Sequence, residues 1–269
     1  MIPKKIHYCW FGGKDIPDTL MKYINGWKAF CPGYEFILWD EDRFDIAAIP
    51  FVKSAYEARK FAFVADYVRA YALYHYGGVY LDTDVELRRS LDCFLTHSAF
   101  TGFESKGLPF TALWAAEKGH LLSKKVMNYY EAKTYTLGQQ TNTNIVSDIL
   151  MNDFKIDPLR NEVQIGRCGE CEIKVYPSEY FCIDLPTSYA VHHFYGSWLP
   201  NKSTSTKDSI MVNYHLERIS EINNAQVLLL KKFSRQIGFL GLMKVIIYFA
   251  YYKLVPRSVD SWIRDFLNR

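Results

Sequence analysis

Two aspartates separated by one residue, Asp82 and Asp84, follow a short apolar run at residues 79–81. The run comes directly after Gly77-Gly78 and predicts a buried strand. In open α/β sheets, ligands bind at the carboxyl ends of the strands. Carboxylate oxygens at that position suit Mg²⁺ or Mn²⁺, which prefer hard ligands. We therefore expect Asp84 to bind a divalent cation directly, and Asp82 to reach either a ribose or a water bound to the cation.

A second pair of charged residues, Asp66 and Arg69, lies in the helical pattern before this strand. Residues three apart share one face of a helix. An arginine there can bind phosphate through two parallel hydrogen bonds (bidentate binding), and an aspartate can accept hydrogen bonds from hydroxyl groups. The alternative is an ordinary surface ion pair, which contributes little. The apolar neighbours Val64 and Val68 favour partial burial, and a buried charge is costly unless it is paired or binds a ligand.

The first forty residues predict the elements that position these groups. Residues 6–11 form an apolar run that ends at Gly12-Gly13, which indicates a buried strand and a turn. A helix capped by Asp18 or Thr19 should run to about residue 30, where Pro32-Gly33 stops it. Residues 34–39 predict the next strand. Strand, helix and strand in this order indicate a parallel sheet and an α/β fold.

The remaining pattern continues the alternation of helices and strands. Apolar residues at helical spacing predict one long helix over residues 54–76, which Gly77 should terminate. Five further segments are expected, in chain order: a strand at 110–116, helices at 121–133 and 142–152, a hairpin at 163–176, and an aromatic loop at 190–198.

The composition allows a large ordered core, because 49% of the 269 residues are hydrophobic and 23% are charged. Aromatic residues make up 16%. Aromatic faces stack on bases and sugar rings, so this content fits a nucleotide or carbohydrate ligand. A core rich in tyrosine explains it equally well.

The net charge of +3 is unevenly distributed. Residues 225–269 contain 8 Lys/Arg and 2 Asp/Glu, so the body before them is slightly acidic. This excludes a nucleic-acid binder, whose basic patch would lie on the folded body. The apolar run at 237–252 is broken by Lys244 and is too short to span a membrane. We expect an amphipathic helical tail on an anionic membrane surface, with a helical cap on the domain as the alternative.

The six cysteines are scattered, so a disulfide framework is not expected and reduced thiols are the default. Cys168 and Cys171 have the spacing of half a zinc site, but no second pair follows them. A hairpin turn at Gly169-Glu170 is the favoured interpretation. The chain leads from Met1 straight into a strand pattern without a signal peptide. A cytoplasmic protein is expected, peripheral at the inner face of the membrane.

Four segments in order carry a family resemblance: residues 6–13 (IHYCWFGG), 61–69 (FAFVADYVR), 76–84 (YGGVYLDTD) and 189–198 (YAVHHFYGSW). Together they resemble the DXD-containing sugar transferases. That family includes the initiating α-1,6-mannosyltransferase, the α-1,4-galactosyltransferases, bacterial capsule and lipopolysaccharide transferases, and the catalytic domains of large glucosylating toxins. The resemblance covers roughly residues 1 to 200.

The resemblance implies a GT-A type fold with a mixed sheet over residues 1–224, followed by the basic helical tail at 225–269. It also implies a retaining transfer of a hexose from a nucleotide sugar, with Mn²⁺ or Mg²⁺. By position, Trp10 would stack on the nucleobase, and a core tryptophan is its alternative role. Asp66 and Arg69 would hold the donor sugar. Asp82 would contact the ribose, and Asp84 would bind the metal.

The resemblance assigns roles to later residues as well. Thr83 would join the nucleotide-sugar site. His192 would complete the metal or diphosphate site, with His193 as the second choice, and packing in the aromatic loop is the alternative for both. Ser197 and Trp198 would close over the diphosphate.

One stretch departs from the family pattern. Many relatives carry Thr-Gly-Pro where this chain has Gln140, Thr141 and Asn142. Asn142 could lie near the sugar, whereas capping of the helix by Thr141 or Asn142 is the favoured role. No carboxylate stands out as a covalent nucleophile, so front-face attack is implied by the family, with Glu104 and Asp148 as alternatives.

The sequence leaves the sugar and the acceptor open. A UDP-linked hexose is the first expectation and GDP-mannose the second, and a lipid-linked glycan of surface polysaccharide synthesis is the expected acceptor. Two other functions compete. Residues 79–85 also fit the strand and DxDx[TV] motif of haloacid-dehalogenase phosphatases, in which Asp82 would be the nucleophile. A non-catalytic module that binds sugar nucleotides is the other.

Overall fold

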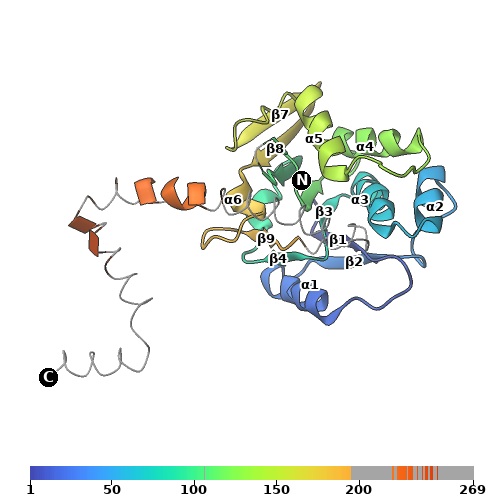
Figure 1. The fold of residues 1–269 in the computed structure, drawn as a ribbon, viewed down its shortest axis with the longest axis horizontal. Coiled ribbons are helices and arrows are strands. Elements are labelled where there is room, and N and C mark those ends of the chain that lie inside the picture. Colours follow the sequence, from blue (N-terminus) through green and yellow to red (C-terminus); the bar gives the residue numbers. More distant parts are fainter. Residues whose placement is uncertain are drawn as a thin grey trace. The chain divides into compact units, whose positions relative to one another are not determined.

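The structure is a computed structural model that describes residues 1–105 and 107–194, and a few positions of the following segment: 220, 223–228, 230–232, 235, 238, 240, 241, 243, 244 and 247. The chain divides into two compact units, Met1–Arg218 and Ile219–Arg269. All strands of the described residues belong to the first unit (Figure 1). The roles expected for residues 1–224 and 225–269 stay predictions.

The described strands form one large sheet and one small one. They are β1 (Lys5–Cys9), β2 (Glu35–Trp39), β3 (Gly78–Leu81), β4 (Val85–Leu87), β5 (Ala99–Gly102), β6 (Leu113–Ala116), β7 (Gln164–Cys168), β8 (Cys171–Tyr176) and β9 (Ala190–His192). The seven-stranded sheet has the order β2-β1-β3-β6-β5-β8-β7, and β4 pairs with β9 in a separate two-stranded sheet.

The large sheet is mixed, as expected. β1 pairs in parallel with both β2 and β3, so the carboxyl ends of these three strands meet at one edge. β6 runs antiparallel to β3 and to β5, while β8 is parallel to β5. Trp10 follows β1 and Asp82 follows β3 at the same edge. The α/β class and the mixed sheet of the expected GT-A type fold are confirmed.

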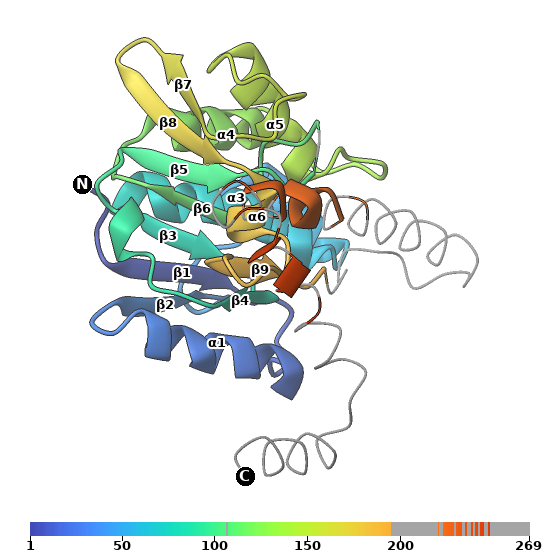
Figure 2. The same ribbon diagram turned by 90° about the vertical axis from the view of Figure 1, so that its left-hand side faces the viewer.

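Helices cover both faces of the sheet. They are α1 (Asp18–Phe30), α2 (Pro50–Glu57), α3 (Phe61–Tyr76), α4 (Leu121–Glu131), α5 (Asn142–Asn152) and the short α6 (Ser178–Phe181), with a 3₁₀ turn η1 at Asp92–Phe94. α3 packs on β1, β3 and β6, and α2 and α4 pack against α3. On the other face, α1 packs on β4, and α6 lies against β5 and β9 (Figure 2).

Alternation along β3 divides the core into two clusters. Tyr80 belongs to the cluster under α2 to α5, whereas Val79 and Leu81 belong to the cluster with α1, β4 and α6. Successive side chains of a strand point to opposite faces, so each face of this buried strand contributes to one cluster. The carboxyl end of β3 is therefore fixed by packing from both sides.

Most predicted elements are confirmed, but residues 190–192 of the predicted aromatic loop form strand β9, and the predicted long helix is divided in two. The sequence predicts a single helix over residues 54–76, but the chain forms α2 and α3 with a break between them. Arg59 in the break has a φ of 57°, a left-handed conformation that a helix cannot contain. Gly77 ends α3 as predicted, with a φ of 64°. Its neighbour Gly78 has a φ of 121° and lies so close to Lys5 of β1 that a side chain has no room.

Helix caps differ from the prediction at one end. Pro17 occupies the N-cap position of α1 with no side-chain cap, so neither Asp18 nor Thr19 caps this helix. At α5 the Thr141 side chain accepts a hydrogen bond from the Asn144 backbone N–H, so capping by Thr141 is confirmed.

The predicted hairpin at 163–176 is confirmed as β7 and β8, with its turn at Gly169-Glu170. Cys168 and Cys171 face each other across the turn. All six cysteines are free thiols. Among the described residues, neither cysteine belongs to a group of three potential metal ligands.

The second unit is described at a limited set of positions, which are helical. Exposed apolar and basic side chains both occur there: Val227, Leu228, Leu230, Lys231, Lys232, Arg235, Leu240, Met243, Lys244 and Ile247. Lys253 lies outside the described residues. Within the described part of the chain, no helix is long and apolar enough to cross a membrane.

Candidate functional site

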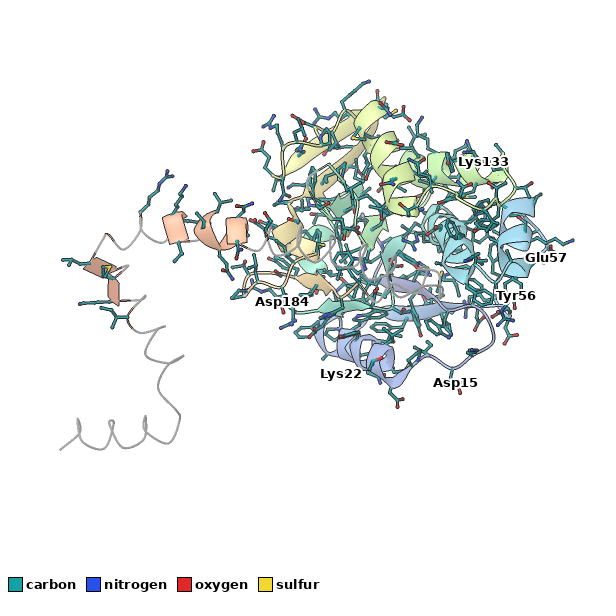
Figure 3. All side chains as sticks on the ribbon, in the orientation of Figure 1. Asp15, Lys22, Tyr56, Glu57, Lys133 and Asp184 are labelled. Carbon is teal, nitrogen blue, oxygen red and sulfur yellow. The ribbon has the colours of Figure 1, made fainter. Side chains whose placement is uncertain are left out.

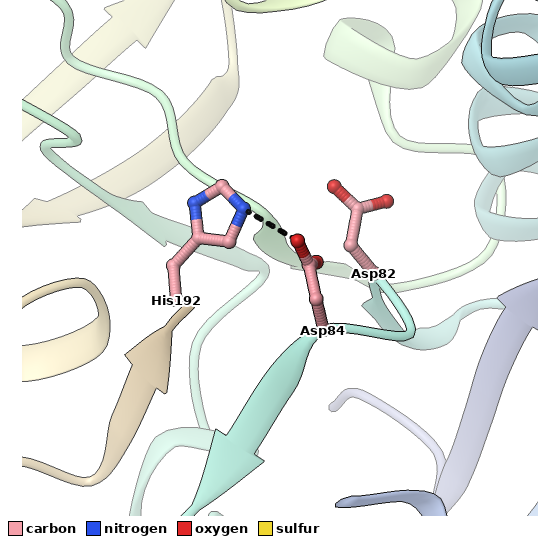
Figure 4. A group of neighbouring side chains, drawn as sticks. All are labelled: Asp82, Asp84 and His192. Atoms are coloured by element: carbon pink, nitrogen blue, oxygen red, sulfur yellow. Dashed lines mark ion pairs between the residues drawn. The ribbon is translucent and has the colours of Figure 1, made fainter. Parts of the chain in front are cut away.

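The site is built around the turn that joins β3 to β4. Asp82 donates its backbone N–H to the carbonyl of Ala112 over 3.0 Å, and its own carbonyl accepts from Val85 over 3.0 Å. These bonds fix a tight turn in which Asp82, Thr83 and Asp84 are all half-buried. The two carboxylates lie next to each other at the carboxyl end of β3 (Figure 4).

Asp82 is held through one of its oxygens. Its Oδ1 accepts a hydrogen bond from the Tyr80 hydroxyl at 3.0 Å and faces an Arg69 Nη2 at 3.0 Å. The Arg69 guanidinium lies over the Tyr80 ring, 4.7 Å from its centre. Because both contacts use Oδ1, Oδ2 is the oxygen that Asp82 can offer to a ligand.

Asp66 and Arg69 extend this network into the core. Arg69 Nη2 lies 3.2 Å from Asp66 Oδ1, and each residue is 7% exposed, so the surface-pair alternative is wrong. Burial raises the pKa of the Asp66 carboxyl to about 7, although Arg69 opposes this effect. Burial also raises the pKa of Asp82, again with Arg69 opposing. Arg69 thus contacts both carboxylates and opposes the rise in pKa that burial causes at each.

His192 reaches the same site from far along the chain. β9 pairs with β4 so that His192 lies opposite Val85, the residue after Asp84. Its Nε2 is 3.5 Å from Asp84 Oδ2. One ligand atom from each of Asp82, Asp84 and His192 lies within 4.8 Å of the others, close enough to hold one metal ion (Figure 4). Burial lowers the pKa of His192, but the Asp84 carboxylate more than offsets this, so the pKa lies well above its usual value.

These donors fit a divalent cation by their chemistry. Carboxylates suit Mg²⁺ and Mn²⁺, and an imidazole is a better ligand for Mn²⁺ and later transition metals than for Mg²⁺. The possible Asp-Asp-His site expected from the sequence is therefore present.

His193 does not join this group. Adjacent residues of a strand point to opposite faces. The Nε2 of His193 lies 2.9 Å from Glu86 Oε2, and its ring stacks on Tyr23 of α1 at 4.6 Å. Its backbone N–H donates to the carbonyl of Asp84 over 3.1 Å. The second-choice metal ligand thus contributes to the site through its backbone.

Trp10 lies at the end of β1, at the same edge of the sheet as Asp82. It is half-buried, and its indole N–H donates to the carbonyl of Lys14. The loop after it is fixed by Glu41, whose carboxylate accepts from the Gly12 backbone at 2.6 Å and from the Tyr56 hydroxyl at 2.8 Å. Figure 3 labels Tyr56 on α2. Stacking of Trp10 on a base stays a prediction.

Ser197 and Trp198 lie outside the described residues. Asn142 is described, and it is buried, with its amide donating to the Tyr130 hydroxyl at 3.0 Å. The negative charge of Asp66 contributes to a raised pKa of that tyrosine, after burial as the main cause. Asn142 and Tyr130 therefore adjoin the buried carboxylate network.

Two residues of the site, Tyr80 and Tyr130, were missed by the sequence reasoning, and Glu104 was named only as an alternative nucleophile. Tyr80 could have been found, because it precedes Asp82 by two residues and so shares its side of the strand. Glu104 follows β5, which carries no strong strand pattern, and its carboxylate lies 3.7 Å from His192 Nδ1. Tyr130 could not have been found, since its sequence pattern is that of an ordinary core residue of α4.

Residues 17–101 match the family model of the glycosyltransferase sugar-binding region containing a DXD motif. The matched segment includes α1, β2, α2, α3, β3 and the Asp82–Asp84 turn. The resemblance to the DXD-containing glycosyltransferase family is therefore confirmed over this segment.

The chain is also similar to individual proteins. Inositol phosphoceramide mannosyltransferase 3 of Schizosaccharomyces pombe is 32% identical over 126 residues, which are 44% of this chain and 34% of that protein. The uncharacterized glycosyltransferase L373 of Acanthamoeba polyphaga mimivirus is 27% identical over 75% of this chain and 85% of its own length. The solved PaToxG glycosyltransferase covers 57% of this chain and 70% of its own, with 15% identity and a TM-score of 0.43. The match thus spans about a third of the yeast relative.

Proposed function

We propose that the chain is a metal-dependent glycosyltransferase that moves a hexose from a nucleotide sugar to a glycan acceptor. The observation that carries the proposal is the convergence of Asp82, Asp84 and His192 at the carboxyl end of β3. Transfer of a sugar from a nucleoside diphosphate concentrates negative charge on the departing phosphates. A bound divalent cation would supply Lewis-acid stabilisation of that charge.

The residues take the following proposed roles. Asp84 and His192 Nε2 hold the cation, and Asp82 Oδ2 faces the ribose or a water on the cation. Arg69 keeps Asp82 ionised and in place, and Asp66 presents a buried carboxyl to the donor sugar. A preorganised site of this kind avoids rearrangement when charge develops.

The nucleotide extends this site along the edge of the sheet. Trp10 supports the base, because it ends the strand next to β3. Thr83, on the turn itself, contacts the donor, and Ser197 and Trp198 close over the diphosphate. The nucleotide sugar would thus bind along the edge of the sheet, with its base near β1 and its sugar near β3.

The stereochemical outcome proposed from the family is retention, with front-face attack of the acceptor. Of the two carboxylates considered as alternative nucleophiles, Asp148 is exposed on α5 and bonded to Gln140. The Glu104 side chain is 9% exposed and adjoins His192. Of the two, this contact favours Glu104 as the alternative nucleophile.

For the donor, the relatives' names point to a mannosyl group, while a UDP-hexose is the expectation from the sequence. A lipid-borne or lipid-linked acceptor agrees with the inositol phosphoceramide in the name of the yeast relative. A thermal-shift panel of UDP- and GDP-sugars with Mn²⁺ decides between the donors, because a true donor stabilises the fold by mass action.

Substitution of Asp84 by alanine tests the central proposal. We expect Asp84→Ala to reduce Mn²⁺-dependent hydrolysis and transfer of the donor by roughly 100-fold or more, the scale of losing a group that stabilises developing charge. The matched control is Glu57→Ala, an exposed carboxylate on α2 (Figure 3). Full activity of a folded Asp84→Ala variant would refute the proposal. Release of phosphate from a phosphomonoester would support the phosphatase instead, and nucleotide binding without transfer or hydrolysis would support a binding module.

A further inference from the structure

We propose that Glu104 is the positioning residue for His192, and that its carboxylate accepts the Nδ1 hydrogen of the imidazole so that Nε2 faces the cation. This inference rests on the metal site of the proposed function. Glu104 belongs to none of the four motifs that carry the family resemblance.

The two ring nitrogens of His192 face different carboxylates. Nε2 lies 3.5 Å from Asp84 Oδ2, on the side of the candidate metal ligands. Nδ1 lies 3.7 Å from Glu104 Oε2. A neutral imidazole has one acceptor nitrogen and one donor nitrogen. Binding of a cation to Nε2 therefore requires the hydrogen to be on Nδ1, where it points at Glu104.

Nδ1 needs an acceptor because it is buried. Within the described residues it has no hydrogen-bond partner. A movement of about 0.8 Å brings the Glu104 oxygen to an ordinary N–H···O distance. Carboxylates that accept the second N–H of a metal-bound histidine fix its tautomer and orientation, and they increase its basicity as a ligand.

The backbone holds Glu104 and His192 in register. The Cys182 thiol donates to the carbonyl of Glu104 at 3.4 Å, and the Cys182 carbonyl accepts from the His192 N–H at 3.0 Å. Glu104 also donates its N–H to Leu108 at 2.9 Å, which closes the turn after β5. The Cys182 thiol adjoins the imidazole as well, but sulfur is a weak acceptor, so the carboxylate is the stronger partner.

The neighbouring residue provides a matched comparison. His193 is also paired with a carboxylate, Glu86, but this pair lies outside the group of Asp82, Asp84 and His192. Removal of Glu86 therefore takes away the carboxylate partner of the neighbouring histidine, His193, without affecting the metal ligands.

The first test measures Mn²⁺ affinity by electron paramagnetic resonance on the whole chain without nucleotide. We expect Glu104→Ala to weaken Mn²⁺ binding about 10- to 100-fold. Glu104→Gln keeps an acceptor oxygen and should lose less, and Glu86→Gln should bind as the parent does. Unchanged Mn²⁺ affinity in folded Glu104→Ala, with a parent that binds Mn²⁺, overturns this inference alone. A parent that binds no divalent cation overturns the proposed metal site as well.

The second test needs no variant of Glu104. In the parent protein labelled with ¹⁵N-histidine and loaded with diamagnetic Zn²⁺, His192 should show a protonated Nδ1 and a metal-bound Nε2. The signal is assigned by its absence in His192→Gln. A metal-bound Nδ1 with the hydrogen on Nε2 contradicts the inference.

Discussion

Asp82 performs two tasks with its two carboxylate oxygens. Oδ1 is bonded to Tyr80 and Arg69, which leaves Oδ2 as the oxygen that can be offered to a ligand. A carboxylate fixed in this way does not need to reorient when a ligand binds, which reduces the entropic cost of binding. Tyr80 and Arg69 are therefore expected to affect ligand affinity without touching the ligand themselves.

Tyr80→Phe tests this division. Loss of the hydroxyl removes one of two hydrogen bonds to a charged acceptor, worth roughly 1.5–3 kcal/mol. We expect the donor kcat/KM to fall about 10-fold or more, with a higher Mn²⁺ requirement. Tyr67→Phe is the control, since the hydroxyl of this buried tyrosine donates to Glu131 of α4 at 2.7 Å and not to Asp82. Equal kinetics in the two variants would contradict a role for Tyr80 in holding Asp82.

For single residues, the sequence predicted which residue types form the site better than it predicted which side chains they contact. The spacing of Asp66 and Arg69 correctly predicted a shared helix face and partial burial. It could not show that Arg69 bridges to Asp82, because that contact depends on how α3 packs over β3. Glu104 was named only as an alternative nucleophile, and its contact with His192 could not be predicted, since only the fold brings the two together.

Among the elements, the three parallel strands are joined by one buried histidine. His7 of β1 donates from Nε2 to the carbonyl of Gly77 at 2.8 Å and accepts at Nδ1 from the indole N–H of Trp39 at 3.1 Å. It thereby connects β1 to the end of β2 and to the start of β3. Both nitrogens are satisfied only in the neutral form. Burial lowers the pKa of His7 to about 4.

This low pKa predicts a dependence of stability on pH. The unfolded chain titrates His7 near pH 6.5 and the folded chain near 4, so between these values the unfolded state binds more protons. The contribution of His7 is complete above about pH 6.5, and about 3 kcal/mol is lost as the pH falls from there towards 4. Urea unfolding at several pH values, compared between the parent and His7→Gln, measures it. Parallel pH profiles for the two proteins would contradict the prediction.

The long, strongly patterned elements could be predicted from the sequence, and the short ones could not. α1, α5 and the β7–β8 hairpin have the predicted bounds within a few residues. β4 and β9 are only three residues long and are stabilised by pairing with each other, a non-local contact. The break at Arg59 was missed because the apolar spacing continues across it.

For the whole molecule, the charge asymmetry predicts a separate role for the tail. Its described residues combine exposed leucines, such as Leu228 and Leu240, with exposed lysines, such as Lys231 and Lys232. We propose that this unit binds an anionic membrane surface at the cytoplasmic face and brings the site to a lipid-linked acceptor. Apolar side chains and basic side chains both contribute to such binding.

Truncation after Asn224 tests the tail. We expect co-sedimentation with phosphatidylserine vesicles to be lost, while donor binding changes less than about threefold, since the metal ligands lie in the first unit. Lys231→Glu with Lys232→Glu in the full chain is the companion variant, and it should weaken binding by about 1 kcal/mol or more per residue. Unchanged sedimentation of the truncated chain would count against the membrane role and leave the tail as a cap.

The two-stranded sheet of β4 and β9 has a consequence for how the site responds to its ligand. Among the described strands β9 pairs only with β4, so the histidine side of the site can separate from the aspartate side while every hydrogen bond of the seven-stranded sheet stays intact. Small units of this kind open at a lower free energy than the whole fold. A cation bound by both Asp84 and His192 would link residues more than a hundred positions apart in the sequence. It would thereby keep β9 paired with β4. The cation concentration would then set how often residues 178–194 exchange their amide hydrogens with water.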